Sequence, residues 1–268
     1  MRITVVELPH EPWALEATWA ELCHHTTSEH SELVLLPELA FVEPLWESAN
    51  FDPERLVAAE ALSDLWLQRL PELGVPAVVG ARPRRLGTDT FIEAFLWTRS
   101  DGAPTALRCK HYLPDEPGAW EARWFARGEA EFPVFEAGDL TFGVNLCTEL
   151  WALETFGGYA AAGGVQAILS PRATEAATIE KWLAVGRVAA IRSGAYSLSS
   201  NRVDPTGTCG GAGWIVDPDG RLLALTRAAE PFATLDLDLA LPAAARATYP
   251  RTVFAAPTPT RSSPAASR

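Results

Sequence analysis

The sequence predicts a layered α/β sandwich rather than a single all-parallel sheet. Three observations favour this fold class. Strand-like and helix-like patterns alternate through the first part of the chain, and hairpin-like pairs of strands dominate its last part. In addition, 48% of the 268 residues are apolar, which is enough to fill a large core.

The first part of the chain has the pattern β, then α, then β. Residues 2–8 and 32–36 are short β-rich runs, and residues 13–23 between them repeat Trp, Leu and Ala at helical spacing. A second helix is predicted over residues 53–70, because Asp52 can cap its first turn and a proline suits the first helical position. Further strands, separated by Gly-Thr-Asp and Asp-Gly turns, are predicted over residues 76–81, 91–98 and 106–110.

A loop rich in Pro and Gly, residues 114–128, precedes the second half of the chain. Helices are predicted there over residues 151–162 and 174–193. The predicted strands are residues 132–135, 140–147, 165–170, 195–201, 213–217, 222–226 and 232–237. With no internal repeat and no linker, residues 1–256 are predicted to form one domain, and the small, polar residues 257–268 a disordered tail.

Composition limits the kinds of partner. The formal net charge of −12 argues against nucleic acid and anionic membranes, which bind basic faces, so a small molecule or another protein is favoured. No apolar run approaches the roughly 20 residues that span a membrane, and no basic, apolar leader opens the chain, so we expect a soluble protein that is not exported. Cys23, Cys109, Cys147 and Cys209 form no metal-binding cluster and are interpreted as free thiols in the reducing cytoplasm.

Two charged residues stand where predicted strands end. Glu38 follows the apolar run 33–36 and Pro37, where burial would raise the pKa of its carboxyl toward the range of a general base. A helix cap or a solvated carboxylate fits that position equally well. Lys110 closes another strand, where a lone lysine is usually a solvated edge charge. Neither position identifies a catalytic group by itself.

The strongest local signal is the segment 142–151. Its strand delivers Cys147 directly into a predicted helix start, which is the arrangement of a nucleophile elbow. The unpaired N–H groups and positive partial charge of a helix N-terminus would shift the thiol toward thiolate, from its ordinary pKa of about 8.5. The position therefore favours a nucleophile over a packed core cysteine.

The order Glu38, Lys110 and Cys147, each at a strand end, resembles the triad of the nitrilase, or carbon–nitrogen hydrolase, superfamily. The likeness extends over roughly residues 1–254. Residues 110–118 and 120–125 look like the lysine loop of the carbamoyl-amide hydrolases in that superfamily, an amidase-like branch. The superfamily's later signature strands and turn are similar to Asn201-Arg202 and to residues 210–220.

The resemblance implies a four-layer α-β-β-α sandwich that pairs through its outer helices into a homodimer or larger homo-oligomer. It implies no cofactor and no metal. Glu38 would be the general base and Cys147 the nucleophile, while Lys110 and the backbone N–H of Thr148 would stabilise the oxyanion. Glu121 matches a second glutamate that holds the lysine and the substrate in register, and a loop carboxylate paired with Arg123 is the alternative.

Thr148, Glu149, Trp151 and Arg172, which all follow Cys147 in the sequence, are candidates for contact with the substrate. Glu149 stands where many members have Asp, and an acid is still favoured in the first turn of a helix. Trp151 suits a pocket wall, although most tryptophans are core or interface residues. Arg172 occupies a position that lines the pocket in relatives and could anchor a carboxylate or carbonyl, while an ion pair with Glu175 is the alternative.

Gly157 and Gly158 stand where the superfamily more often has a helix-favouring, Arg-rich turn. Each glycine costs about 1 kcal/mol against alanine inside a helix. They predict a kink, an early helix end or close packing at a subunit contact.

The expected function is hydrolysis of the carbon–nitrogen bond in small amides or carbamoyl compounds through a cysteine thioester, with release of ammonia or an amine. Nitriles need the same triad, so a true nitrilase is an alternative. A catalytically silent protein that binds a ligand or partner is the alternative of a different class, and the altered residues after Cys147 are its support.

Overall fold

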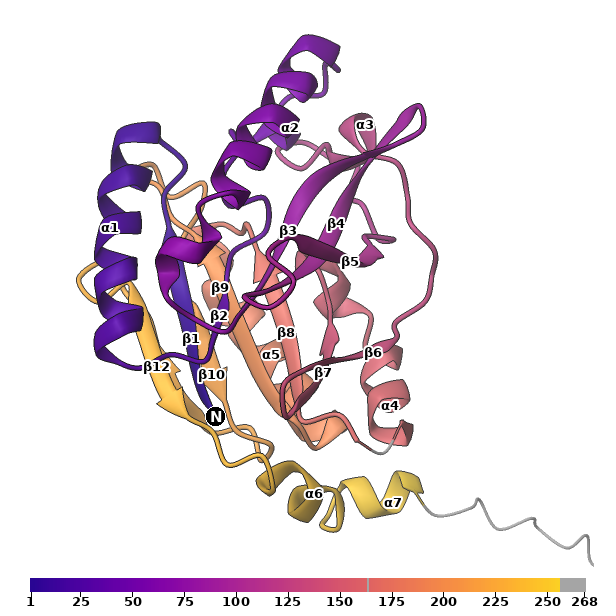
Figure 1. Ribbon diagram of the computed structural model, residues 1–268. Coiled ribbons are helices and arrows are strands. Elements are labelled where there is room, and N and C mark those ends of the chain that lie inside the picture. The colour runs from indigo at the N-terminus through magenta and orange to yellow at the C-terminus, as the bar shows by residue number, and fades with distance from the viewer. Residues whose placement is uncertain (163, 256–268) are drawn as a thin grey trace, which may run out of the picture.

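The computed structural model describes residues 1–162 and 164–255, whose strands form two sheets joined through β1 (Figure 1). The first part of β1 pairs with β12 and β2, whereas Glu7 and Leu8 at its end pair with β9. The first sheet contains, in spatial order, β12 (Phe232–Asp236), β1 (Arg2–Leu8), β2 (Leu33–Leu35), β3 (Ala77–Leu86), β4 (Asp89–Thr98) and β5 (Pro104–Cys109). The second contains β6 (Val134–Ala137), β7 (Leu140–Val144), β8 (Ala167–Arg172), β9 (Tyr196–Arg202), β10 (Trp214–Val216) and β11 (Leu222–Leu225).

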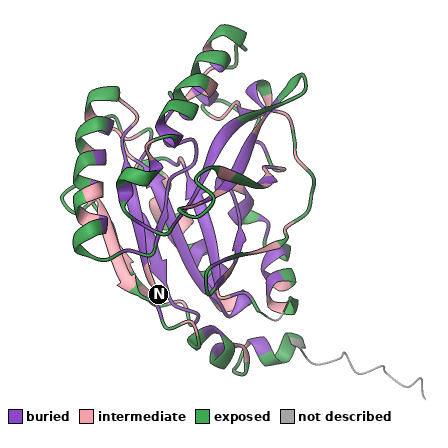
Figure 2. Cartoon of the chain, in the orientation of Figure 1, coloured by how far each residue is buried: buried purple, intermediate pink, exposed green. Residues whose placement is uncertain are grey.

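Helices cover the outer face of each sheet. The described helices are α1 (Pro12–Ser28), α2 (Pro53–Leu67), α3 (Glu121–Trp124), α4 (Glu154–Ala161), α5 (Ile179–Ser193), α6 (Leu241–Arg246) and α7 (Arg251–Ala255). Short 3-10 helices are η1 (Leu45–Glu47), η2 (Leu70–Leu73), η3 (Cys147–Trp151) and η4 (Ala176–Thr178). Figure 2 shows mostly buried central strands and exposed outer faces on α1 and α2.

Three hydrophobic clusters correspond to the three interfaces between four layers. Side chains alternate across a strand, so Ile3 and Val5 of β1 enter the cluster between the sheets, while Val6 and Leu8 enter the cluster beneath α1. In β8, Leu169 faces the cluster between the sheets, and its neighbour Ile168 packs with residues of α4 and α5. The predicted four-layer α-β-β-α sandwich is confirmed.

Most predicted elements are present with small shifts of boundary. Asp52 caps α2 as expected, because its carboxylate accepts hydrogen bonds from the N–H groups of Glu54 at 2.9 Å and Arg55 at 3.2 Å. The helix predicted over residues 53–70 ends at Leu67 and continues as η2. The helix predicted over residues 151–162 is shorter, since the chain first forms η3 and begins α4 only at Glu154.

Three short helices were not predicted. α3, α6 and α7 have 4, 6 and 5 residues, too few for a hydrophobic periodicity to become visible in the sequence. The early helix end predicted at Gly157 and Gly158 is wrong, because α4 runs through both glycines. Close packing does occur at Gly157, but within the chain: a Cβ there would lie 3.1 Å from a terminal nitrogen of Arg192 on α5.

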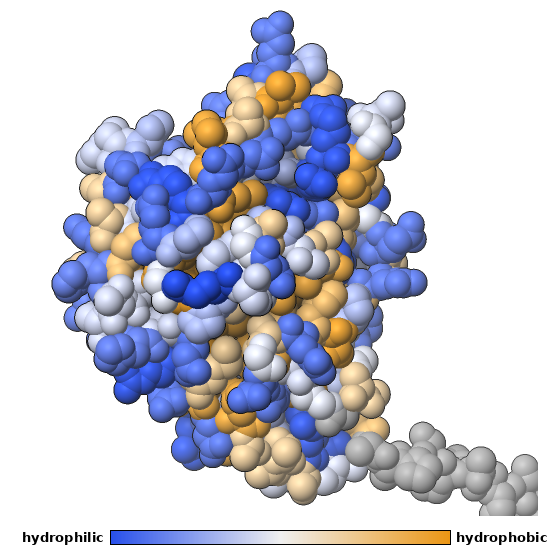
Figure 3. Space-filling model, viewed as in Figure 1, coloured by the Kyte–Doolittle hydropathy of each residue, from blue (hydrophilic) through white to orange (hydrophobic). Residues whose placement is uncertain are grey.

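The predicted disordered tail, residues 257–268, lies outside the described residues. Within the described part of the chain, no helix combines the length and the apolar character needed to cross a membrane. Figure 3 shows hydrophilic and hydrophobic residues intermixed over one face of the molecule.

Candidate active site

The direction of the strands brings the predicted reactive residues to one edge of the sandwich. β2, β7, β8 and β9 run parallel to one another through β1, and β5 shares their direction because two antiparallel pairings, β3 with β4 and β4 with β5, restore it. The carboxyl ends of all these strands therefore lie at the same edge, which is where ligands bind in open α/β sheets. Glu38, Lys110 and Cys147 each follow one of these strands.

Lys110 is a buried cation held between two carboxylates. Its Nζ lies 2.8 Å from Oε1 of Glu38 and 2.7 Å from Oε2 of Glu121, and its side chain is 0% exposed. Burial opposes charge on Lys110, but the carboxylates of Glu121 and Glu38 outweigh it and raise the pKa of the lysine. The ammonium is therefore permanent at neutral pH.

Glu121 begins α3 and lines the cavity beside Cys147. Burial raises the pKa of Glu121 to about 7, although the Lys110 ammonium acts in the opposite direction. The alternative pairing with Arg123 is wrong, because Arg123 contacts Asp115 at 2.6 Å instead. The charge of Glu121 therefore changes near physiological pH.

Cys147 begins η3 with a backbone φ of +46°, in the left-handed region that a residue with a side chain rarely adopts. Such strain costs about 1–3 kcal/mol and persists where the surroundings enforce it, often at functional sites. This sharp turn after β7 is the predicted nucleophile elbow, and it exposes the thiol to the cavity.

The predicted shift of the Cys147 thiol toward thiolate is wrong. Burial raises the pKa of the Cys147 thiol, the Glu38 carboxylate raises it further, and the Lys110 ammonium offsets these effects only in part. Moreover, the cysteine begins a short 3-10 helix rather than a long α-helix, so the dipole that the prediction relied on is small. The thiol needs a base to lose its proton.

Glu149 joins the cysteine segment to the lysine segment. One of its oxygens accepts the N–H of Leu146 at 2.9 Å, and the other accepts the N–H of His111 at 2.7 Å. The Arg108 guanidinium binds both oxygens of this carboxylate, and Glu149 is fully buried. The prediction that Glu149 contacts the substrate is therefore wrong, because all its acceptor capacity is used to hold Cys147 and Lys110 in register. Arg108 was not identified from the sequence, although it shares a strand face with Lys110 two residues on.

Arg172 lies in the core and not in the cavity wall. Its guanidinium donates to Oγ of Ser199 at 2.7 Å, to Oγ1 of Thr174 at 2.6 Å and to the carbonyl of Ala212 at 2.8 Å. It also stacks over Trp214, 4.1 Å from the ring centre. Both the substrate anchor and the ion pair with Glu175 are therefore wrong, because the end of β8 directs this side chain inward. Burial lowers the pKa of Arg172 to about 9.

Asn201 and Arg202, at the end of β9, fasten two loops of the site. The Asn201 amide accepts the N–H of Thr174 at 2.9 Å and donates to its carbonyl at 3.1 Å. Arg202 donates to the carbonyls of Leu39 at 3.1 Å and Val42 at 2.7 Å, just after Glu38. The Asn-Arg pair at this strand end therefore holds the loops that follow β8 and β2.

A cavity of about 350 Å³ opens onto Cys147. Thr148 and Trp151 line it as expected, and so does Glu121. Its wall also contains Trp46 and Trp182. The volume suits a small molecule rather than a polypeptide chain.

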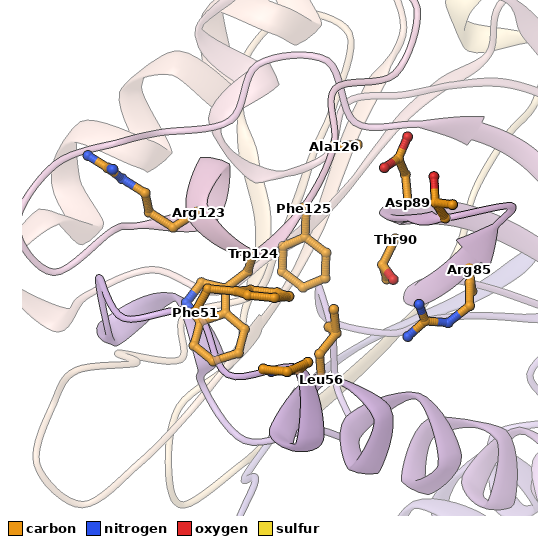
Figure 4. A pocket seen from close by; sticks show the side chains of 11 residues that line it. Phe51, Leu56, Arg85, Asp89, Thr90, Arg123, Trp124, Phe125 and Ala126 are labelled. Atoms are coloured by element: carbon orange, nitrogen blue, oxygen red, sulfur yellow. The ribbon is translucent and has the colours of Figure 1, made fainter.

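A second cavity lies on the other side of α3 (Figure 4). Trp124 of this helix packs against Phe51, with ring centres 5.6 Å apart, and Leu56 lies beneath them. Its described lining contains no cysteine and no lysine, whereas Cys147 lines the first cavity. The short α3 thereby separates the two cavities, with Glu121 on one side and Trp124 on the other.

Comparison with known proteins places this arrangement in a family. The sequence profile of the carbon–nitrogen hydrolases matches residues 2–247. The chain therefore belongs to the carbon–nitrogen hydrolase family, within the nitrilase superfamily, as its motifs predict. No curated protein sequence matches it.

Several solved structures share the fold at low sequence identity. A carbon–nitrogen hydrolase from Helicobacter pylori G27 is 20% identical over 94% of each chain, with a TM-score of 0.79. A carbon–nitrogen hydrolase superfamily protein from Xanthomonas campestris is 20% identical, covering 94% of this chain and 96% of its own, with a TM-score of 0.75. An amidase from Nesterenkonia sp. is 22% identical, covering 88% of this chain and 90% of its own, with a TM-score of 0.71.

Proposed function

We propose that this carbon–nitrogen hydrolase cleaves small amides or carbamoyl compounds through a thioester on Cys147. The observation that carries the proposal is the buried Lys110, held at 2.8 and 2.7 Å by two carboxylates and electrostatically coupled to the neighbouring thiol. A buried ammonium beside a protonated nucleophile and a carboxylate supplies what amide cleavage needs: a proton acceptor, an attacking atom and a fixed positive charge.

In the first half of the reaction, Glu38 takes the thiol proton while Cys147 attacks the carbonyl carbon. The Lys110 ammonium and the backbone N–H of Thr148 stabilise the negative charge that develops on oxygen. Glu38 then gives its proton to the leaving nitrogen, and ammonia or an amine departs as the tetrahedral adduct collapses to the thioester. In the second half, water attacks the thioester, its proton passes to Glu38, and the thiol returns with release of the acid.

Mass spectrometry and ammonia release test this proposal. Wild-type protein is incubated with a panel of amides, carbamoyl compounds and nitriles. We expect ammonia release and a thioester adduct on Cys147, both absent in Cys147→Ala, while Cys23→Ala serves as the matched thiol control. Glu38→Gln should lower kcat by about 10²–10⁴-fold, the usual contribution of general acid–base catalysis. Turnover that survives in Cys147→Ala would refute the mechanism, and nitriles turned over faster than amides would favour the nitrilase alternative.

Acrylamide offers a second probe. In a variant of the Nesterenkonia amidase it has added to the active-site cysteine. The same adduct on Cys147, and on none of the other three thiols, would support the assignment of the nucleophile. All four cysteines are free thiols in the structure, as predicted, while a cytoplasmic location stays a prediction.

We also propose that the chain forms a homodimer or larger homo-oligomer through its outer helices. Support comes from apolar side chains that α4, α5 and α7 leave exposed beside one another in the fold. Val188 lies on α5, Leu153 precedes α4, and Val253 and Phe254 lie on α7. Exposed apolar patches of this kind commonly mark protein–protein contacts.

A further inference from the structure

The charge of the cavity at Cys147 is one-sided. Among the described residues that line it are Glu116, Glu121 and Glu175, and none is a lysine, an arginine or a histidine. Glu116 and Glu175 are exposed, and neither forms an ion pair with any residue that the structure describes. A cleft lined by charges of one sign raises the local concentration of ligands with the opposite sign.

Lys110 and Arg172, two buried cations behind this cavity, do not balance these glutamates. Lys110 is 0% exposed, and its charge is shared between Glu38 and Glu121. Arg172 is fully buried behind the cavity wall, and its guanidinium donates to Ser199, Thr174 and Ala212. The open part of the cavity therefore presents uncompensated negative charge to a substrate, unlike the region around the scissile bond.

Aromatic rings supply a second feature that favours a cation. Trp46, Trp151 and Trp182 line the cavity. The first already carries Arg202 at 5.1 Å from its ring centre, and Trp182 carries Arg172 at 5.8 Å. Trp151 is 46% exposed and contacts Trp182 with ring centres 5.4 Å apart, and no cation of the described residues lies over its ring, so it is the tryptophan of this wall that is free to take a ligand cation.

Building on the proposed function, we infer that the preferred substrates are small amides or carbamoyl compounds that carry a positive charge remote from the scissile bond. The ammonium or guanidinium end contacts Trp151 and the carboxylates of Glu116 and Glu175, while the carbonyl carbon faces Cys147. A negatively charged substrate finds no cationic partner in the described lining.

Three amides of matched length test the inference: 5-aminopentanamide, hexanamide and glutaramate. They end in an ammonium, a methyl and a carboxylate, respectively. We expect kcat/KM for 5-aminopentanamide to exceed that for hexanamide by about tenfold, mainly through KM, with glutaramate the poorest. Added salt should reduce this ratio, because exposed charges are screened.

Variants assign the preference to the residues named. The double variant Glu116→Gln, Glu175→Gln should bring the ratio for the ammonium and methyl amides toward one, and Trp151→Leu should lower it by a smaller factor. Glu180→Gln, an exposed acid of α5 outside the cavity, is the matched control and should leave the ratio unchanged. Circular dichroism confirms that each variant is folded.

The outcomes separate this inference from the proposed function. Hydrolysis that depends on Cys147 but shows equal kcat/KM for the three amides, or a preference for glutaramate, overturns the charge preference and leaves the amidase proposal intact. If no amide is hydrolysed, the amidase proposal fails. Calorimetry with Cys147→Ala then decides the charge preference alone, because tighter binding of 5-aminopentanamide than of hexanamide supports it and equal binding overturns it.

Discussion

At the scale of single residues, the reactivity of this site is set by what surrounds each group and not by the group alone. The Cys147 thiol is kept protonated by burial and by Glu38, whereas Lys110 is kept charged by two carboxylates despite complete burial. Burial raises the pKa of Glu121 to about 7. A resting thiol beside an available carboxylate is a less oxidisable state than a thiolate, because the thiolate is the reactive form.

The pH dependence of activity should report on Glu121. Because its pKa is raised to about 7, the carboxylate is ionised above that pH and protonated below it, where Lys110 loses one of its two partners. We therefore expect kcat/KM to fall as the pH drops through about 7. The measurement is a profile for an uncharged amide between about pH 5 and 9. In Glu121→Gln the activity should be lower at every pH and this limb should disappear; an unchanged limb would assign it to another group.

Arg172 should affect stability more than substrate binding. Replacing it in Arg172→Met leaves the polar groups of Ser199, Thr174 and Ala212 without their buried donor. We expect the free energy of unfolding to fall by about 1–3 kcal/mol, the cost of unsatisfied buried polar groups. Urea unfolding measures the loss, with Arg187→Met on the exposed face of α5 as the control. A large rise in KM at unchanged stability would restore the anchor interpretation.

At the scale of elements, the site is assembled from strand ends that side chains connect through hydrogen bonds and an ion pair. β7 ends before Cys147 and β5 before Lys110, and Glu149 with Arg108 ties these two ends. The short α3 contributes Glu121 to the same cluster. Rigid strands with fixed ends hold reacting groups more precisely than free loops do.

Removing the Glu149–Arg108 ion pair should lower kcat and change KM little. Glu149→Gln places an amide NH₂ opposite N–H groups that now donate hydrogen bonds to the carboxylate. It also removes the negative charge that pairs with the Arg108 guanidinium. Since a displacement of about 1 Å costs about 10²-fold, we expect a loss of that order in kcat. Arg108→Met should give a similar loss, and the double variant should be no worse than either, as a double-mutant cycle measures. Additive losses would show that the two residues act separately.

At the scale of the whole molecule, the cluster between the two sheets holds both halves of the site at a fixed distance. Leu169 of β8 is 0% exposed in that cluster, packed together with residues of the opposite sheet such as Val5 and Leu35. Leu169→Ala should cost about 2–5 kcal/mol of unfolding free energy, because it creates a cavity in a close-packed interior. Denaturant titration checks this value, and Leu223→Ala, an exposed leucine of β11, should cost far less.

The oligomeric state follows from the outer layers. If α5 forms a subunit contact, Val188→Glu places a charge in the middle of it and should convert the assembly to monomers. Light scattering coupled to size-exclusion chromatography measures the mass, with Val57→Glu, an exposed valine of α2, as the control. A wild-type chain that elutes as a monomer at micromolar concentration would contradict the proposed oligomer.

How far the site was predictable depends on the kind of signal each residue leaves in the sequence. Cys147 was recognisable because a strand runs directly into a helical turn, and Glu38 and Lys110 because each follows an apolar strand. Glu149 was recognised as an acid in a first turn, but its partner Arg108 lies 41 residues away, so their pairing leaves no local pattern. Arg172 was misassigned because its position on β8 does not say which way the side chain points at the strand end.

The sequence by itself determined the alternation of strands and helices and the membership of a family, because side-chain periodicity and short motifs act over a few neighbouring residues. The four layers and the roles of Glu38, Lys110 and Cys147 were expectations that followed from the resemblance to that family; the structure confirms the layers, and the roles stay a proposal. Only the tertiary structure decided that Cys147 rests as a thiol, that Glu149 and Arg172 are buried supports, and that the cavity is acidic. The reason is physical: desolvation and charge pairing depend on groups brought together from distant parts of the chain, and those distances exist only in the folded molecule.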